Sequence, residues 1–318
     1  MLLSCGDALI DFLPVKSQDG RDAIVPVAGG SCLNVAVGMA RLGAAAGFVG
    51  GISNDLFGRI VAGHALASGV GLGYATRSDH QCTLAFVRTV DGEPQYAFYD
   101  EGSASRNWTY RSGSIPFGEV GAIHVGSTTL VSEAGAAQAS AMIGEAKGSA
   151  TISFDPNCRP NLVKDKPAYA ARMAHFAAAA DIVRMSDVDF RYLHDHDDHA
   201  NWAASMLAAG VSLVVITRGA RGVVAWHRKA GMLSIEASKI AIVDTIGAGD
   251  SFQAALLFAL DALGRIRIGD LAEIDAGGLA RALSFAAACA AITCGRVGAD
   301  PPWRAELRAE MLERLQRA

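Results

Sequence analysis

The chain has 318 residues, 51% of them hydrophobic, and its 28 basic and 32 acidic residues leave a net charge of -4 at neutral pH. This length predicts one large or two modest domains, and the composition supplies ample apolar side chains for a core. Since no basic block or Lys/Arg stripe occurs in the sequence, nucleic acid is not expected to be a partner.

The first twelve residues, MLLSCGDALIDF, are apolar but lack a positively charged beginning, and Asp7 interrupts them. They predict a buried first strand with Asp11 at its end, and no signal peptide. Uncharged runs further along are shorter than the roughly 18 residues that a membrane span needs, so none is expected. The six cysteines are scattered without a CxxC pair, which predicts reduced thiols in a cytoplasmic protein rather than disulfides or a zinc site.

Strands and helices alternate along most of the chain. NVAVGMARLG predicts a helix ending at Gly43, AGFVGGIS a strand, and NDLFGRIVAGHALASG a second helix capped by Asn54. From about residue 110, the β-rich runs AIHVG, ATISFD, DIVRMS and SLVVITRG alternate with Ala-rich stretches. One such stretch is a helix with Ser132 as N-cap and Gly148 as its stop. This order predicts an α/β fold with a mostly parallel sheet that helices cover on both faces.

Two segments, residues 12–28 and 81–100, interrupt the alternation with β-rich hairpins, the second joined through Asp91-Gly92. They are either plain surface hairpins or a small β-sheet lid that projects from the core and covers a site. A small sheet has exposed edges and an apolar face, which predicts a homodimer through the lid. The expected contact residues are Phe86, Val87, Tyr96 and Phe98.

Two further stretches have simple interpretations. The tail WRAELRAEMLERLQRA predicts an amphipathic helix that packs Leu307, Met311 and Leu315 on the core. HDHDDH, residues 194–199, offers His194 and Asp198 as metal ligands only if they share a helix face. It falls between two expected helices, so a solvated connector is the favoured interpretation.

The stretch DTIGAGD, residues 244–250, begins an apolar helix with three residues that have almost no side chain. Gly247, Ala248 and Gly249 can act only through their backbone, and unpaired N–H groups at a helix start bind anions such as phosphate. The spacing is neither a P-loop nor a dinucleotide fingerprint. Asp250 would repel a phosphate, so it is either a base that takes a proton from an attacking hydroxyl or a helix-start carboxylate.

DTIGAGD resembles the DTxGAGD signature of the ribokinase-like, or PfkB-type, carbohydrate kinases, and the resemblance covers nearly the whole chain. AGGSCLNVAVGMARLG is similar to the family's sugar-side motif, and GGISNDLFGR to its G-x-(x)-D-x-F-G stretch. DPNCR matches the DPNxR run of fructokinase-like members, and TRGARG the nucleotide loop. The resemblance implies a three-layer αβα sandwich with a core of residues 1–11, 29–80 and 101–318. It places the nucleotide in the C-terminal half of that core, and the lid, residues 12–28 and 81–100, over the sugar.

The resemblance also implies roles for individual residues. Asp250 would be the catalytic base, and the amides of Gly247, Ala248 and Gly249 the anion hole. The sugar would bind to Asp11, Gly29, Gly30, Asn34 and Arg159. Thr217, Gly219 and Gly222 would line ATP. Without the resemblance, Asn34 would be interpreted as a helix cap and Arg159 as part of a surface ion pair. Thr217, Gly219 and Gly222 would be interpreted as an ordinary turn between strands.

Two metal ions are implied by the family. Its N-x-x-E motif for Mg²⁺ falls on Ser186-Asp187-Val188-Asp189, which departs from the pattern at both ends and leaves Asp189 as the candidate ligand. CGRVGAD resembles the family's cation loop, so K⁺ is expected behind the anion hole at Asp244 and nearby carbonyls. These carbonyls lie near Ile246, Thr293, Arg296 and Gly298, and Pro302 stands where some members carry a serine.

Fructose is the favoured sugar, because GDALIDFLP, DPNCR and YAFYDEGSASRNW resemble fructokinase segments. 2-Keto-3-deoxygluconate, whose carboxylate Arg88 or Arg106 would bind, remains an alternative, as do ribose and a nucleoside stacked on Tyr96, Phe98 or Tyr99. A Rossmann-type dehydrogenase would need GxGxxG after the first strand, which is absent. A non-catalytic sugar-sensing protein is disfavoured by the intact loop and Asp250.

Overall fold

The computed structural model describes residues 1–90, 93–238 and 240–316, and the side chains of these residues except 87–90, 93–96 and 316. The strands form a sheet of nine, in the order β13-β12-β11-β10-β9-β8-β1-β4-β5, and a sheet of four, in the order β3-β2-β6-β7. The strands are β1 Leu2–Cys5, β2 Leu9–Lys16, β3 Asp22–Gly29, β4 Ala46–Ser53, β5 Gly71–Ser78, β6 Thr83–Val90, β7 Glu93–Tyr99, β8 Ala122–Gly126, β9 Thr151–Asp155, β10 Ile182–Ser186, β11 Leu213–Thr217, β12 Val223–His227 and β13 Gly231–Ile235.

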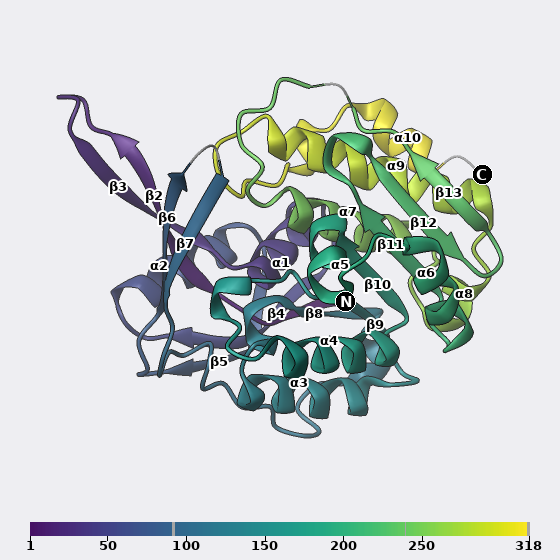
Figure 1. Cartoon of the computed structure of the whole chain (residues 1–318), viewed down its shortest axis with the longest axis horizontal. Helices are drawn as coiled ribbons and strands as arrows, with labels where there is room; N and C mark the ends of the chain where they lie inside the picture. The colour runs from purple at the N-terminus through teal and green to yellow at the C-terminus, as the bar shows by residue number, and fades with distance from the viewer. Residues whose placement is uncertain (91–92, 239, 317–318) are drawn as a thin grey trace.

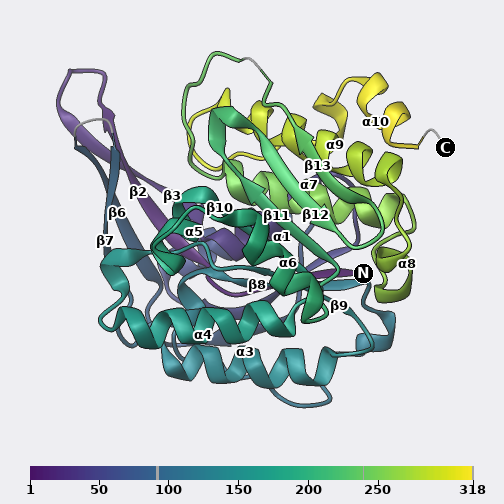
Figure 2. The same ribbon diagram turned by 45° about the vertical axis from the view of Figure 1, so that its right-hand side comes forward.

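Helices cover both faces of the large sheet (Figures 1 and 2). Neighbouring strand residues point to opposite faces, so Leu3 and Val214 pack with α3 to α6, whereas Leu2 and Val215 pack with α1 and α7 to α10. The helices are α1 Ser31–Arg41, α2 Leu56–Ala67, α3 Glu133–Ala146, α4 Lys166–Ala179, α5 Asp187–His194, α6 His199–Ala208, α7 Ala248–Ala262, α8 Ile268–Ala272, α9 Ala276–Cys294 and α10 Ala309–Gln316.

The nine-stranded sheet is parallel from β5 to β11, and β12 and β13 add antiparallel strands at one edge. Chain order runs outward from β1 to β5 in one direction and from β8 to β11 in the other. The direction therefore reverses between β1 and β8. In open α/β sheets, ligands bind beyond the carboxyl ends of the strands at such a reversal, and the functional site is expected there.

The small sheet, made of β3, β2, β6 and β7, projects from the core, and its β2–β3 hairpin extends furthest (Figure 1). An aromatic cluster lies on the face of the small sheet that packs against α2. The Phe12 ring stacks on Phe86 at 4.6 Å, and Phe57 of α2 meets Phe12 edge-on at 5.5 Å. This packing anchors the base of the small sheet on α2, while Ile24 and Val25 near the tip stay exposed.

Several element boundaries differ from the predictions. The first strand was predicted to reach Asp11, but it ends at Cys5, and Asp11 lies in β2 of the small sheet. The cap of α2 is Asp55, whose carboxylate accepts the Gly58 N–H at 2.7 Å, and not Asn54. The predicted cap Ser132 is confirmed by its bond from the Gly135 N–H. The predicted turn at residues 91 and 92 lies outside the described residues.

The C-terminal segment is less regular than predicted. A short 3-10 turn, Arg304–Glu306, precedes α10, so the helix begins only at Ala309. Leu307 and Leu315 are nonetheless buried in the core formed with α7 and α9, as predicted. The run 194–199 is confirmed as a connector, because His194 ends α5 and His199 begins α6.

α9 has 19 residues and is apolar enough, by length and composition, to cross a membrane. In this fold it packs against α7, α10 and β13, and Leu279, Leu283 and Cys289 are fully buried. The core helix of a globular protein can have the same length and composition as a membrane span. Packing in the core therefore accounts for the apolar sequence of α9.

Candidate active site

A cavity of about 1070 Å³ lies at the carboxyl ends of the parallel strands, where the sheet order reverses. This volume is at the upper end for small-molecule sites, so the cavity has room for more than one ligand. Most of the predicted site residues line it. These are Asp11, Gly30, Asn34, Arg159, Asp189, Thr217, Gly219, Gly222, Gly247, Ala248, Gly249 and Asp250. Gly29 and Asp244 lie just behind this lining.

The beginning of α7 forms one wall of the cavity. Gly247 is the N-cap, with a left-handed φ of 74°, and a Cβ there would collide with Ala299. The Ala248 N–H makes only a long bond, 3.3 Å, to the Thr245 carbonyl. Since first-turn amides have no partner within an α-helix, this wall carries the backbone N–H groups that the sequence predicts to bind an anion.

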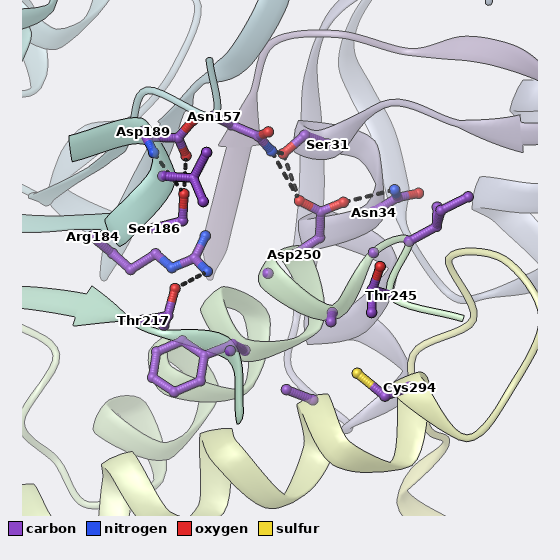
Figure 3. Close-up of a pocket in the computed structure, with 18 of the residues that line it drawn as sticks. Ser31, Asn34, Asn157, Arg184, Ser186, Asp189, Thr217, Thr245, Asp250 and Cys294 are labelled. Carbon is purple, nitrogen blue, oxygen red and sulfur yellow. Dashed lines mark hydrogen bonds between the residues drawn. The ribbon is translucent and has the colours of Figure 1, made fainter. Parts of the chain in front are cut away.

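Asp250 is buried in this wall, and its carboxylate faces α1 rather than its own helix (Figure 3). Oδ1 accepts the Ser31 hydroxyl at 2.6 Å and Oδ2 the Asn34 amide at 2.9 Å, and Asn157 donates to Oδ1 at 3.3 Å. No side chain caps α7. Asp250 is a carboxylate in the first turn of α7, as one of the two interpretations has it, and its role as a base stays a prediction. The interpretation of Asn34 as a helix cap is wrong, because α1 lacks a side-chain cap.

A helix start favours the ionised form of a carboxylate in its first turn. In the structure, burial raises the pKa of this carboxyl above the usual aspartate value, and the hydrogen bonds from Ser31 and Asn34 offset only part of the shift. A carboxylate that holds its proton more strongly than usual is a stronger base once ionised, which is the property a proton acceptor needs.

Asp11 lies across the cavity on β2. Burial and the nearby Asp7 and Asp250 carboxylates raise its pKa to about 7, although Arg159 opposes the shift. A Cβ on Gly29 would collide with the Asp11 carboxylate, and one on Gly30 would approach the Asp7 carbonyl oxygen at 2.6 Å. The two glycines therefore let this part of the chain lie close to both aspartates.

The loop after β9 carries Arg159 and brings Asn157 to Asp250. The Arg159 guanidinium donates to the Asn157 carbonyl at 3.1 Å and the Cys158 carbonyl at 3.0 Å, and it also contacts the Asn157 side chain. Arg159 thus binds backbone carbonyls of its own loop. Asn157 has a left-handed φ of 37°, rare for a non-glycine residue, and this conformation aims its amide at Ser31 and Asp250.

The far end of the cavity is formed by β11, the turn after it and α9. Thr217 ends β11, and Gly219 and Gly222 both have left-handed φ values in the turn that leads to β12. Opposite this turn lie apolar side chains that sequence reasoning did not assign to the site. They are Ile240, Ile242, Ala287, Ala290, Ala291 and Cys294. This end can therefore take a flat apolar group.

The two predicted metal ligands differ in their surroundings. Asp189 lines the cavity and accepts the Ser186 hydroxyl at 2.8 Å and the Cys158 N–H at 3.1 Å, and burial raises its pKa. Asp244 lies behind the anion-binding loop, where it accepts the Ile246 N–H at 3.0 Å and the Gly298 N–H at 2.8 Å. It thereby joins the two loops expected to surround a monovalent cation.

Sequence reasoning assigned no role to four polar residues of the cavity wall, Asp7, Ser31, Asn157 and Arg184. Asp7 follows β1 and accepts bonds from the Cys32 N–H and the hydroxyls of Ser127 and Thr128. Asp7 and Asn157 each follow a strand end and Ser31 begins α1, whereas Arg184 lies in the middle of β10, so position at a strand end or helix start was a usable signal only for the first three. The bonds of Ser31 and Asn157 to Asp250 join segments more than 90 residues apart, which spacing alone does not reveal.

Comparison with known proteins agrees with this geometry. The model of the pfkB family carbohydrate kinases matches residues 1–306. A fructokinase of Rhizobium leguminosarum bv. trifolii is 38% identical over 82% of this chain and 79% of its own, and fructokinase-1 of Oryza sativa is 32% identical over 100% and 98%. A crystal structure of a fructokinase with bound ATP from Xylella fastidiosa is 28% identical, with a TM-score of 0.87 over 99% of this chain and 98% of that chain.

A doubly wound sheet whose reversal point holds a helix start, a buried aspartate and a large two-ended cavity defines a ribokinase-like sugar kinase. The chain belongs to the pfkB family of carbohydrate kinases. The predicted fold, family and class of enzyme are therefore confirmed.

Proposed function

We propose that this protein transfers the γ-phosphate of ATP to a hydroxyl of D-fructose. The observation that carries the proposal is the position of Asp250, a buried carboxylate between the anion-binding start of α7 and the polar side chains Asp11 and Asn34. The polar end suits a sugar, and the apolar end beside α9 suits an adenine ring. The similarity to fructokinases supports the choice of sugar.

In the proposed reaction, Asp250 accepts the proton of a primary sugar hydroxyl as its oxygen bonds to the γ-phosphorus. The bond from that phosphorus to the oxygen shared with the β-phosphate breaks, and the electron pair leaves with ADP. The amides of Gly247, Ala248 and Gly249 stabilise the charge on the transferred group. Asp11, Asn34, Gly30 and Arg159 orient the sugar, Gly29 holds Asp11, and Thr217, Gly219 and Gly222 border the nucleotide.

Mg²⁺ would accompany the nucleotide, and the side chains fit this role. Mg²⁺ prefers oxygen ligands and needs only one or two carboxylates when phosphates supply the rest. Asp189 lines the cavity, and its carboxylate accepts hydrogen bonds from the Cys158 N–H and the Ser186 hydroxyl. A carboxylate has about four lone-pair sites, so acceptor capacity is left for a metal ion. The bound ion would neutralise charge on the phosphates. Kinase activity that survived an excess of chelator would remove the divalent ion from this proposal.

K⁺ is proposed behind the anion hole, at Asp244 and carbonyls of the loops that Asp244 joins. The ion would order these loops without touching the substrates, so we expect faster turnover in potassium than in tetramethylammonium chloride at equal ionic strength. The measurement is the initial rate in potassium, sodium and tetramethylammonium salts. Equal rates in all three would exclude the ion from the mechanism.

Charge in the cavity bears on the choice of sugar. A keto acid needs a cation for its carboxylate, but Arg106 is ion-paired with Asp100 and lies outside the cavity lining. The Arg88 side chain is outside the described residues. Phe98 lines the cavity, whereas Tyr99 is 65% exposed and packs edge-on against Phe86. Arg106 is therefore not placed to bind the carboxylate of a keto acid.

We expect fructose to have a higher kcat/KM than ribose, 2-keto-3-deoxygluconate or adenosine. Coupled detection of ADP release across these four substrates measures it. A keto acid or nucleoside that exceeded fructose tenfold, about 1.4 kcal/mol of transition-state binding, would identify a different kinase of the family. Sugar binding without ADP release from any substrate would instead indicate a sensor.

The small sheet is proposed to act as a lid over the sugar and as the contact of a cytoplasmic homodimer, with the division into core and lid predicted above. Val15, Ile24 and Val25 are exposed apolar side chains on the hairpin that projects, and soluble proteins cover such faces. Of the expected contact residues, Phe86 packs within the aromatic cluster, Phe98 lines the cavity, and the Val87 and Tyr96 side chains lie outside the described residues. Light scattering at micromolar concentration should give twice the chain mass, and a strict monomer would refute the dimer.

A further inference from the structure

Arg184 is a buried arginine in the wall of the active-site cavity for which the reaction described above has no role. It lies in β10, is 5% exposed, and extends toward the side of the cavity where α7 begins (Figure 3). A Cβ added to Gly249 would lie 2.9 Å from its Nη1 and 3.0 Å from its Nη2. The guanidinium is therefore in contact distance of the predicted anion hole.

The contacts of Arg184 leave part of its donor set unused. Nη1 is ion-paired with Asp155, and Nη2 donates to the Thr217 hydroxyl at 2.7 Å. Nε is buried and has no hydrogen-bond partner among the described residues. A guanidinium carries five N–H donors and stays charged in proteins, and a buried donor without a partner is unfavourable. Nη1 and Nη2 each carry a second N–H, and an anion in the cavity that Arg184 lines would accept from these donors.

We propose that the Arg184 guanidinium binds phosphate oxygens of the nucleotide beside the anion hole and stabilises the charge that develops on the departing diphosphate. The proposal rests on the proposed kinase function. Asp155 holds one edge of the planar group, Thr217 holds another, and the Phe252 ring lies 5.8 Å from its centre. This fixed orientation favours the forked donor geometry that suits phosphate, and the low polarity of a buried site strengthens the attraction.

An ion pair with a purely structural role would not require all of the Arg184 contacts described above. It would need Arg184 to neutralise Asp155, but it would not need the arginine to line the cavity, to contact Gly249 or to keep unused donors there. The two roles predict different effects of an Arg184 substitution on the binding of ADP and of adenosine. A phosphate contact affects ADP but not adenosine, whereas loss of a structural pair affects both nucleotides alike or neither.

The test compares ADP and adenosine binding by calorimetry in Arg184→Gln, Arg184→Lys and the wild type. Arg184→Gln should weaken ADP binding about 10- to 100-fold and leave adenosine unchanged. It should also lower kcat by about 10²- to 10³-fold, as expected for one lost donor at a developing charge. Arg184→Lys, which keeps the charge, should restore much of the ADP affinity. Arg172→Gln, a partly buried arginine that binds the Leu130 and Val131 carbonyls outside the cavity, should bind ADP normally.

Because Arg184→Gln leaves Asp155 buried without its partner, a second comparison removes both charges. Arg184→Met combined with Asp155→Asn is measured against Asp155→Asn alone, and the double variant should bind ADP at least tenfold more weakly. Equal ADP affinity in this comparison would overturn the role of Arg184. A wild-type protein that binds no ADP would instead overturn the kinase function on which the proposal rests.

Discussion

Replacing Asp250 with asparagine should lower kcat by about 10²- to 10⁴-fold, the range expected for a positioned acid–base group. Asparagine keeps the size of the side chain and can still bond to Ser31 and Asn34, but it cannot accept the proton of the sugar hydroxyl. Folding stability should hold or rise slightly, because burial raises the pKa of the Asp250 carboxyl and the substitution removes a costly buried charge. Steady-state kinetics with a melting curve for each variant measure both effects.

The matched control is Asp261→Asn, which removes the same charge from the exposed end of the same helix. It should leave kcat near the wild-type value. A kcat in Asp250→Asn that matched this control would show that Asp250 is not the base. ADP binding should persist in both variants, since the removed charge repels phosphate.

The pH profile gives a second readout of the same groups. Asp250 and Asp11 act as carboxylates, and their pKa values are raised, that of Asp11 to about 7. The wild-type kcat/KM should therefore fall as the pH is lowered through about 7, well above the range of an ordinary aspartate. Because the carboxylates interact, the inflection belongs to the pair rather than to one residue. An acid limb that began only near pH 4 would contradict the raised values.

The sequence was sufficient for those parts of the molecule that depend on local patterns. The alternation of β-rich runs and Ala-rich helices predicted the parallel sheet, and DTIGAGD predicted the helix start that lines the cavity. The prediction from the sequence was wrong where tertiary contacts determine the end of a strand. MLLSCGDALIDF reads as one strand, but Gly6 packs against Cys32 and the Asp7 carboxylate binds the start of α1, so the chain divides into β1 and β2.

The partners of the base could not be predicted in the same way. Ser31, Asn34 and Asn157 reach Asp250 from segments 93 to 219 residues away. Nothing in the spacing DPNCR indicates that Asn157, rather than Arg159, bonds to the base, because this depends on the left-handed turn at Asn157. Local patterns therefore located the site, and only the packed fold showed how its side chains bind one another.

Replacing Gly249 with alanine should lower kcat/KM for ATP by about 10²-fold while leaving the fold intact. Gly249 lies in the first turn of α7 in a conformation that alanine adopts readily, and alanine is the better helix former. The added methyl group would lie 2.9 Å from Arg184 Nη1, so either the buried guanidinium moves or the loop shifts. Displacement of a positioned group by about 1 Å costs about this factor in rate.

Gly144→Ala separates this effect from helix stability. Gly144 lies within α3, and a Cβ there meets no atom within 4 Å. This control should gain up to about 1 kcal/mol of stability, the helix preference of alanine over glycine, with unchanged kinetics. Since both substitutions add one methyl group to a helix, only contact with the anion hole distinguishes them. If Gly249→Ala kept full activity with ATP, the space beside Gly249 would not be where phosphate binds.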